Sequence, residues 1–329
     1  MKRSLKNCCR HGCKHWRLLR AGIALLAGIA LPAWSQPLAF SFGVISQTAA
    51  TITTVADDTH LKEAIVASDS DNLAFVVMNG IKTAAEPCSD RFFFKRKEVF
   101  QGAKNGLIVS LAASDWSACQ NGSGQSLAVE RLNRIRELFF ETEFSFGGSK
   151  LPLLRQASMT KFRAYVENVR WDVGNLVFAT LHLPANNNDF MSAAGRNSEF
   201  EDRLIADREW LQRTFSIAVQ KNAAAVVLFC DANPLAAPER SGRFGIGVRR
   251  DGFLEIRKLL LSLSERFAGR VLLIHGRKES GAGAESGVFW HGRIGTIAPT
   301  LNLLKVSVDA SAPTLFSISQ TGVSKTASQ

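Results

Sequence analysis

Short apolar runs alternate with amphipathic segments in the first part of this sequence. Residues 40–45, 73–77 and 106–111 are apolar runs of strand length, and such runs predict buried strands. Between them, residues 59–67 and 90–101 carry apolar side chains at helical spacing. Strand, helix, strand, helix, strand is the order of a layered α/β fold, so the sequence predicts that class.

The alternation continues to the end of the chain. One helix is predicted to end at Phe140, and another to begin at Ser198, which has the spacing of a capping box with Glu201. The other predicted elements are strands at 161–170, 175–183, 224–229 and 271–274, a helix at 248–267, and short strands near 288–292, 301–307 and 314–318. No repeat or linker divides them, so we predict one domain over residues 36–329.

The apolar run at 73–77 leads directly into Met78, Asn79 and Gly80. Its β-branched and aromatic residues are typical of a central strand that is buried on both faces. In α/β proteins, ligands and catalytic groups gather beyond the carboxyl ends of such strands. An apolar side chain, an amide and bare backbone stand there, so the place where chemistry is expected lacks an ionisable group.

The first 35 residues have the anatomy of a secretory signal. Basic residues without any acid precede an uncharged apolar run at 21–31, and Ala33-Trp34-Ser35 has the pattern of a cleavage site. The run is short for a membrane span, which needs about 20 residues. We predict a signal peptide at 1–35 and a periplasmic or secreted protein without a stable transmembrane segment. The alternative is an uncleaved segment that anchors the protein to the membrane.

Removal of this leader changes the charge and the cysteine content. Seven basic residues leave with it, which reduces the net charge from +11 to +4. So small an excess does not indicate nucleic acid as a partner. Cys88 and Cys119 lie in polar loop sequence, and we expect them to form a disulfide in an oxidising compartment. Cys230 ends an apolar strand and is expected to be a buried thiol.

Polar residues follow several of the predicted strands. One acid or imidazole per loop is how two-metal hydrolase sites are assembled. A histidine on a strand can equally be a core residue, and an aspartate after a strand can be a turn residue, so both interpretations stay open. The strand-end residues are Gln47, Asn79, Ser114, Asp115, His182, Asp231 and His275.

Several segments also occur in a recognisable order. They include F-S-F-G-V-I-S-Q-T, F-V-V-M-N-G-I-K, A-S-D-W-S-A-C, L-P-L-L-R-Q, Y-V-E-N-V-R-W and L-H-L-P-A-N-N-N. In this order and spacing, from about residue 40 to residue 308, the chain resembles a bacterial secreted branch of the calcineurin-like metallophosphoesterases. The resemblance implies a four-layer α/β/β/α sandwich of two mixed β-sheets, with a dinuclear metal site at the strand ends.

The resemblance implies that two metal-binding aspartates are missing. The family's first-strand motif G-D-T is similar to Ser46-Gln47-Thr48, which places Gln47 at the aspartate position. The family's G-D-I-K motif, whose aspartate bridges the metals, is similar to Asn79-Gly80-Ile81-Lys82, which places Gly80 at the bridge. Glycine offers no side-chain oxygen, and an amide is a weak substitute for a carboxylate. We therefore expect that no pair of cations binds.

The remaining motifs are also altered. Ser114 stands where the resemblance implies an asparagine ligand, and Asp231 lies near the position of a histidine ligand. His275 persists in the last motif, but Glu279 occupies its final histidine position. The loop at Asn187 is expected to line the same cleft.

These observations predict a secreted metallophosphoesterase-like protein with an eroded metal site, which serves as a catalytically inactive binding or interaction protein. Its partner would be a small phosphorylated ligand or a protein, and no cofactor is expected. One alternative is an active phosphoester hydrolase with a rebuilt, single-metal site for Mn, Fe or Zn at Asp115, Asp231 and His275. The other is a structural or partner-binding protein of the envelope. The predicted pocket comprises Gln47, Asn79, Gly80, Ser114, Asp115, His182, Asn187, Asp231, His275 and Glu279.

Overall fold

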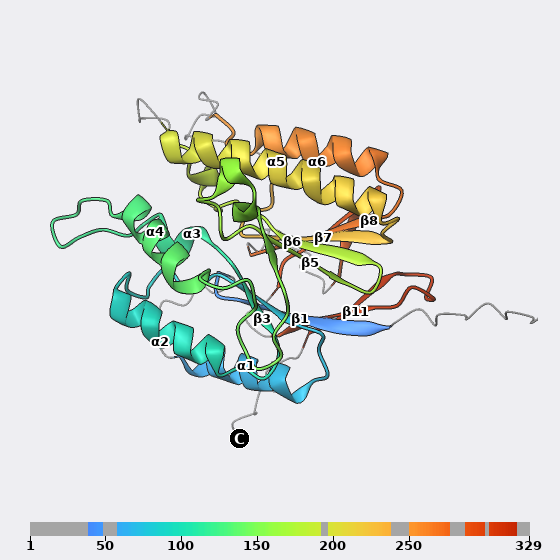
Figure 1. Cartoon of the computed structure of the whole chain (residues 1–329), viewed down its shortest axis with the longest axis horizontal. Coiled ribbons are helices and arrows are strands. Elements are labelled where there is room, and N and C mark those ends of the chain that lie inside the picture. The colour runs from blue at the N-terminus through green and yellow to red at the C-terminus, as the bar shows by residue number, and fades with distance from the viewer. Residues whose placement is uncertain are drawn as a thin grey trace, which may run out of the picture. The chain divides into compact units, whose positions relative to one another are not determined.

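Two mixed β-sheets form the framework of the protein (Figure 1). The structure is a computed structural model that describes residues 39–48, 58–191, 197–237, 250–276, 287–299 and 303–320. The first sheet has the order β12-β11-β1-β2-β3. Strands β1, β2 and β3 are parallel, whereas β11 and β12 are antiparallel to their neighbours. The bounds are β1 Phe40–Ser46, β2 Val76–Asn79, β3 Leu107–Ser110, β11 Leu304–Val308 and β12 Phe316–Gln320.

The second sheet has seven strands in the order β4-β5-β6-β7-β8-β10-β9. The run β6-β7-β8-β10 is parallel, and β5 and β9 pair antiparallel on either side of it. The bounds are β4 Leu154–Arg155, β5 Val169–Val173, β6 Leu176–Thr180, β7 Ala225–Cys230, β8 Arg270–His275, β9 Phe289–His291 and β10 Ile294–Ile297.

Helices cover the sheets on the faces turned away from each other (Figure 1). The first sheet packs against α1, α2 and α4, and the second packs against α5 and α6. The bounds are α1 Thr59–Ser70, α2 Asp90–Gln101, α3 Ala113–Trp116, α4 Ala128–Phe139, α5 Ser198–Gln220 and α6 Leu254–Arg266, with short 3-10 helices at Gln156–Ser158, Thr160–Phe162 and Asn187–Asp189.

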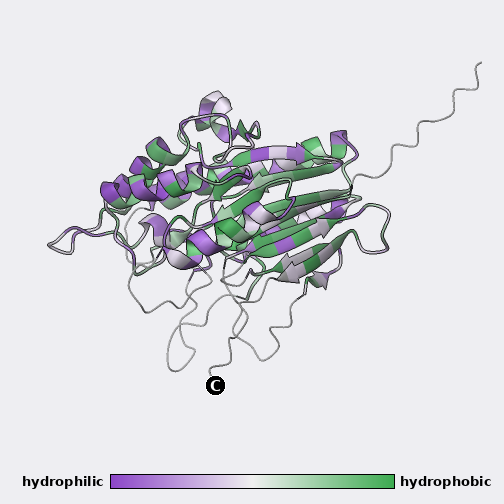
Figure 2. Ribbon diagram, turned by 90° about the horizontal axis from the view of Figure 1, so that it is seen from below, coloured by the Kyte–Doolittle hydropathy of each residue, from purple (hydrophilic) through white to green (hydrophobic). Residues whose placement is uncertain are grey.

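The period-2 geometry of the strands distributes their apolar residues between two packing layers. In β7, Val227 and Phe229 face the other sheet, whereas Val226 and Leu228 face α5 and α6. A strand whose two faces are both covered needs an unbroken apolar run. This explains the sequence of β7, A-V-V-L-F-C, and the hydrophobic colour of the strands in Figure 2.

Aromatic rings fill the space between the sheets. Phe42 and Phe75 stack with ring centroids 5.1 Å apart, and Phe75 meets Phe178 of the other sheet at 5.0 Å. Trp171 stacks on Phe178 at 5.6 Å and on Phe229 at 5.8 Å. Each such pair contributes about 0.5–1.5 kcal/mol beyond the burial of its surface. The sheets are therefore joined by an aromatic core with defined ring geometry.

Several sequence-based boundaries need correction. The first strand of the predicted pair begins at Val169, because the preceding residues form short 3-10 turns. Asn197 is the N-cap of α5 and Ser198 its first helical residue, so the predicted capping box at Ser198 is wrong. Asn79 is the last residue of β2 and does not break it. The strands β4 and β10 were not predicted. The predicted signal peptide at 1–35 lies outside the described residues.

A disulfide joins Cys88 to Cys119, the pair that the sequence predicts, with the two Cα atoms 5.8 Å apart. It connects the loop after β2 with the segment after α3. Cys230 is a buried free thiol, also as expected. No helix of the described residues is long and apolar enough to cross a membrane. A disulfide with this spacing fits an extracellular or periplasmic location.

Replacement of both disulfide cysteines should lower the stability of the protein. The two residues are 31 positions apart, and closure of a loop of that size corresponds to about 3–4 kcal/mol. We expect Cys88→Ser/Cys119→Ser to reduce the free energy of unfolding by about this amount, as measured by urea denaturation. Dithiothreitol should destabilise the wild type but leave the double variant unchanged. Equal sensitivity of both proteins to the reductant would contradict the prediction.

Candidate functional site

Four loops converge beyond the carboxyl ends of β1, β2, β7 and β8. The point of convergence is Gly276. A Cβ atom on Gly276 would lie 2.1 Å from Thr48 Oγ1, 2.9 Å from Asn79 Nδ2 and 3.0 Å from Asp231 Oδ1. We call these four residues, Thr48, Asn79, Asp231 and Gly276, the strand-end site. Because each comes from the end of a different strand or from the loop that follows it, only the folded chain brings them together.

Direct hydrogen bonds cross from one sheet to the other at the strand-end site. Asn79, which is buried at the end of β2, donates from Nδ2 to the carbonyl of Cys230 at 3.0 Å. Asp231 Oδ2 accepts from the backbone N–H of Ala113 and from that of Ala185, both at 2.8 Å. Asn79 Oδ1 has no hydrogen-bond partner among the described residues. The two sheets are thus connected by an amide and a carboxylate at this edge.

Asp115 lies close by, but its carboxylate is fully used by backbone groups. Oδ1 accepts from the N–H groups of Ile81 and Lys82 at 2.8 and 3.0 Å, and Oδ2 accepts from Ala112 at 2.8 Å. Burial raises the pKa of Asp115 to about 7, although these bonds oppose the rise. Asp115 therefore shapes the loops after β2 and β3, and it has little capacity left for a metal ion.

His182 is held by hydrogen bonds at both ring nitrogens. The indole N–H of Trp116 can only donate, so Nε2 of His182 accepts from it at 3.1 Å. Nδ1 must then carry the proton and donate to Glu167 Oε1 at 3.0 Å. Burial lowers the pKa of His182 despite this carboxylate. His182 is a neutral core residue without a free lone pair for a metal.

Glu167 is the charged centre of this buried region. Burial alone would raise its pKa, but Arg136 and His182 hold it below the usual range of a glutamate. Arg136 Nε donates to Glu167 Oε2 at 3.0 Å. The sequence pattern does not single out Glu167, and the only available signal is an acid two residues before β5.

The side chains of the asparagine loop after β6, residues 186–188, also form hydrogen bonds within the protein. Asn187, Asn188 and Asp189 have φ values of 59°, 57° and 54°, a left-handed turn that asparagine and aspartate tolerate better than most residues. Asn188 is buried, accepts from Arg203 and donates to the carbonyl of Gly252 at 3.1 Å. Asn187 bonds the backbone of residues 250 and 252. These amides hold the loop in place.

The other predicted residues have varied positions. Gln47 is half-buried, and its N–H donates to the carbonyl of Asn79 at 2.9 Å. Gly80 adopts φ +83°, and a Cβ there would lie 3.1 Å from Thr48 Cγ2 and 3.3 Å from Ala112 Cβ.

Ser114 donates to the carbonyl of Lys82 at 2.9 Å. His275, buried at the end of β8, pairs in register with Cys230. Glu279 lies outside the described residues.

The donor set at the strand ends does not fit a pair of metal ions. Two divalent cations need a bridging carboxylate and several further oxygen or nitrogen ligands. Gly80 supplies no side chain, Asp115 is saturated by backbone groups, and both nitrogens of His182 are engaged. Within the described ranges, no group of three His, Cys, Asp or Glu residues is placed to hold a metal ion.

In comparisons with known proteins, no family model and no curated protein matches this chain.

The close packing of side chains around Gly276 leads to a prediction about stability. A methyl group on Gly276 would collide with Thr48 Oγ1, so Gly276→Ala should reduce the free energy of unfolding by about 1–3 kcal/mol. Thr48→Ala removes the colliding hydroxyl and should recover part of this loss in the double variant. Gly122→Ala is a suitable control because no atom lies within 4 Å of its added Cβ. Denaturant titration measures the four variants and the wild type, and additive effects at 48 and 276 would contradict the predicted collision.

A second prediction concerns pH and Asp207, whose hydrogen-bond donor Asn168 also accepts from the backbone N–H of His182. Asp207 Oδ1 accepts from Asn168 at 2.8 Å, and its Oδ2 has no hydrogen-bond partner in the described part of the chain. Burial raises the pKa of Asp207 to about 8, although nearby Arg203 opposes the rise. The folded protein therefore retains this proton at pH values where the unfolded chain loses it. The resulting stability is complete below about pH 4 and is lost as the pH rises towards 8.

Asp207→Asn removes this titration while it preserves the shape of the protonated side chain. We expect the wild type to lose at least about 1 kcal/mol of stability relative to the variant between pH 4 and pH 8. Urea denaturation at several pH values measures the difference, and other titrating groups cancel in the comparison. A difference that stays constant with pH would show that Asp207 is ionised in the folded state.

Proposed function

We propose that the protein is a secreted, metallophosphoesterase-like protein that has lost its dinuclear metal centre and serves as a binding or interaction protein. The observation that carries this proposal is the direct bonding between sheets at the strand-end site. Asn79 bonds Cys230, and Asp231 bonds Ala113, at the edge where the family resemblance implies two metals. The three apolar clusters support the four-layer α/β/β/α arrangement that the resemblance implies.

The surroundings of Gly80 support the loss of the metal bridge. The resemblance implies a bridging aspartate at this position. A Cβ at Gly80 would press on Thr48 and Ala112, and φ is +83°. Strain of this kind costs about 1–3 kcal/mol. The neighbouring loops therefore occupy space that an aspartate would need, so introducing that residue alone is not expected to create metal binding.

The chemistry of the strand-end site favours a ligand that donates hydrogen bonds. Asn79 Oδ1 is an acceptor without a hydrogen-bond partner among the described residues, and Asp231 is acidic. Lys82, the nearby cation, donates to the carbonyls of Thr83 and Ser114 at 2.8 and 2.9 Å. A phosphate dianion would face the carboxylate of Asp231 without a free cation from this part of the described structure. We therefore infer a hydroxyl- or amine-bearing group, including one on a protein partner, in preference to a phosphorylated ligand.

The second candidate function is a hydrolase with a single metal. Its support is the placement of Asp231 and His275 at the ends of adjacent strands, because Cys230 and His275 pair in register. A third protein ligand would be needed to complete such a centre. A purely structural role in the envelope is the third candidate, and it predicts no response to small ligands.

Elemental analysis of the purified mature protein distinguishes these functions. The proposal predicts far less than one equivalent of Mn, Fe or Zn and no turnover of p-nitrophenyl phosphate. Two equivalents of metal with turnover would overturn the proposal. One equivalent that is lost in Asp231→Asn and retained in the half-buried control Asp309→Asn would favour the single-metal hydrolase.

Thermal melting tests the inferred ligand class. A compound that binds the native protein raises Tm. We expect polyols or amines at millimolar concentration to raise Tm of the wild type more than that of Asn79→Ala, and inorganic phosphate to have no effect. A larger shift with phosphate than with polyols or amines would contradict the inference. No shift with any of these compounds would favour the structural role.

A further inference from the structure

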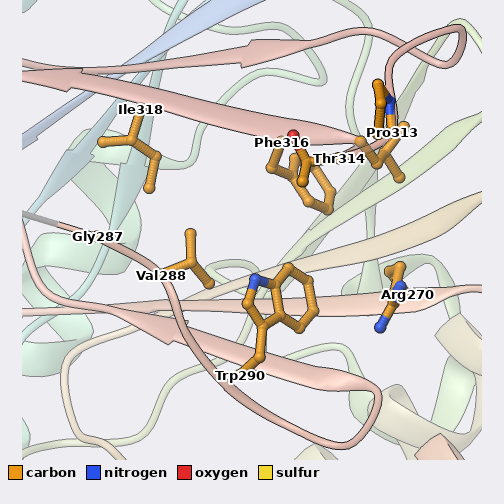
Figure 3. Close-up of a pocket in the computed structure, with 9 residues that line it drawn as sticks. Arg270, Gly287, Val288, Trp290, Pro313, Thr314, Phe316 and Ile318 are labelled. Carbon is orange, nitrogen blue, oxygen red and sulfur yellow. The ribbon is translucent and has the colours of Figure 1, made fainter.

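A second site lies between the edges of the two sheets, at the opposite end of β8 from the strand-end site. Arg270 begins β8 and His275 ends it, so the two sites are separated by about 16 Å of strand. The cavity has a volume of about 480 Å³, within the range of about 300–1,000 Å³ typical of small-molecule sites. Its lining comes from β9, β12 and adjoining segments, as Figure 3 shows, and includes Arg270, Val288, Trp290, Leu315, Phe316 and Ile318.

The cavity exists because both sheets end here. β9 is the last strand of the seven-stranded sheet, and β12 is the last strand of the five-stranded sheet. Phe316 belongs to the central apolar cluster, and Val288, Leu315 and Ile318 pack against that cluster while partly exposed. The floor of the cavity is therefore the outer boundary of the aromatic core, and Arg270 and Thr314 add polar groups to the lining.

Two aromatic side chains face each other across the sheet edges. The rings of Trp290 and Phe316 are nearly parallel, at 23°, with centroids 6.4 Å apart. This distance is near the upper end of the range for aromatic pairs, about 4.5–7 Å. Trp290 remains 40% exposed, an unusual degree for the largest apolar side chain next to a core. An apolar ligand in the cavity would remove this surface from water.

Arg270 supplies a charged group at the rim of the same cavity. Its guanidinium lies 5.2 Å from the centre of the Trp290 ring, and Nη1 donates a long bond of 3.4 Å to the carbonyl of Gly292. No acidic side chain in the described ranges forms an ion pair with Arg270. Most of its five donors are therefore available, and a guanidinium binds carboxylates through paired hydrogen bonds.

We propose that this cavity, which we call the sheet-edge pocket, binds a small apolar carboxylic acid. The apolar part lies against Trp290 and Phe316, and the carboxylate pairs with Arg270. A mixed lining, with apolar side chains on the floor and a cation at the rim, suits a ligand that is itself part apolar and part anionic. The pocket is separate from the strand-end site, so this inference does not depend on the function proposed for that site.

Fluorescence of 1-anilinonaphthalene-8-sulfonate, an apolar anion, tests the sheet-edge pocket in the full mature chain. 4-Phenylbutyrate should displace the dye, and the neutral analogue 4-phenylbutanol should displace it at least tenfold less effectively. Arg270→Gln should weaken 4-phenylbutyrate about tenfold and leave 4-phenylbutanol unchanged. Trp290→Ala should weaken both compounds.

The protein provides a matched control pair. Phe94 is another exposed ring, at 47%, with the guanidinium of Arg134 at 5.7 Å from its centre, but it belongs to α2 and lines no part of the sheet-edge pocket. Phe94→Ala should change displacement by less than twofold. Equal affinity of the wild type and Arg270→Gln for the acid, or equal displacement by acid and alcohol, would overturn the proposal. If Trp290→Ala fails to fold, Arg270→Gln still decides the outcome because its side chain is exposed.

Discussion

The hydrogen bonds of Asn79 and Asp231 join the two sheets where their parallel strands end. Asn79 reaches from β2 to the carbonyl of Cys230, and Asp231 reaches from the end of β7 to Ala113 and Ala185. Removing one partner of such a buried bond costs about 1–3 kcal/mol. The loops around Gly276 are packed so closely because these bonds hold them, and the chemistry available at this edge follows from that packing.

The buried polar residues behind this edge have a structural role of the same kind. Trp116, His182, Glu167 and Arg136 form a continuous chain of hydrogen bonds between α3, the segments flanking β5 and β6, and α4. The charges of Glu167 and Arg136 in this chain balance each other, and the imidazole of His182 is neutral. A complete network of this type specifies one arrangement of the surrounding elements. The same bonds engage both ring nitrogens of His182, so the contacts that stabilise this region also leave its imidazole without a lone pair for a metal ion.

The two ends of the sheets differ in chemistry. At the strand-end site, most polar side chains and backbone groups bond one another, and Asn79 Oδ1 is an acceptor without a partner among the described residues. At the sheet-edge pocket, edge strands leave apolar surface and a cation exposed, because an edge strand has no neighbour to cover it. Most hydrogen-bonding groups of the strand-end site are already bonded within the protein, whereas Arg270 in the sheet-edge pocket still has donors available for a ligand. Small-molecule binding by this protein is therefore better supported at the sheet-edge pocket.

Much of the fold could be predicted because it depends on local pattern. The apolar runs that became β1 and β7 and the helical spacing of α2 are properties of neighbouring residues, and so are the polar loops that hold Cys88 and Cys119. The sequence also showed that Gln47 and Gly80 carry no carboxylate. It could not show that Asp115 is saturated by backbone N–H groups or that His182 lies between Trp116 and Glu167. Those partners are up to 66 residues apart, and only packing in three dimensions decides which groups meet.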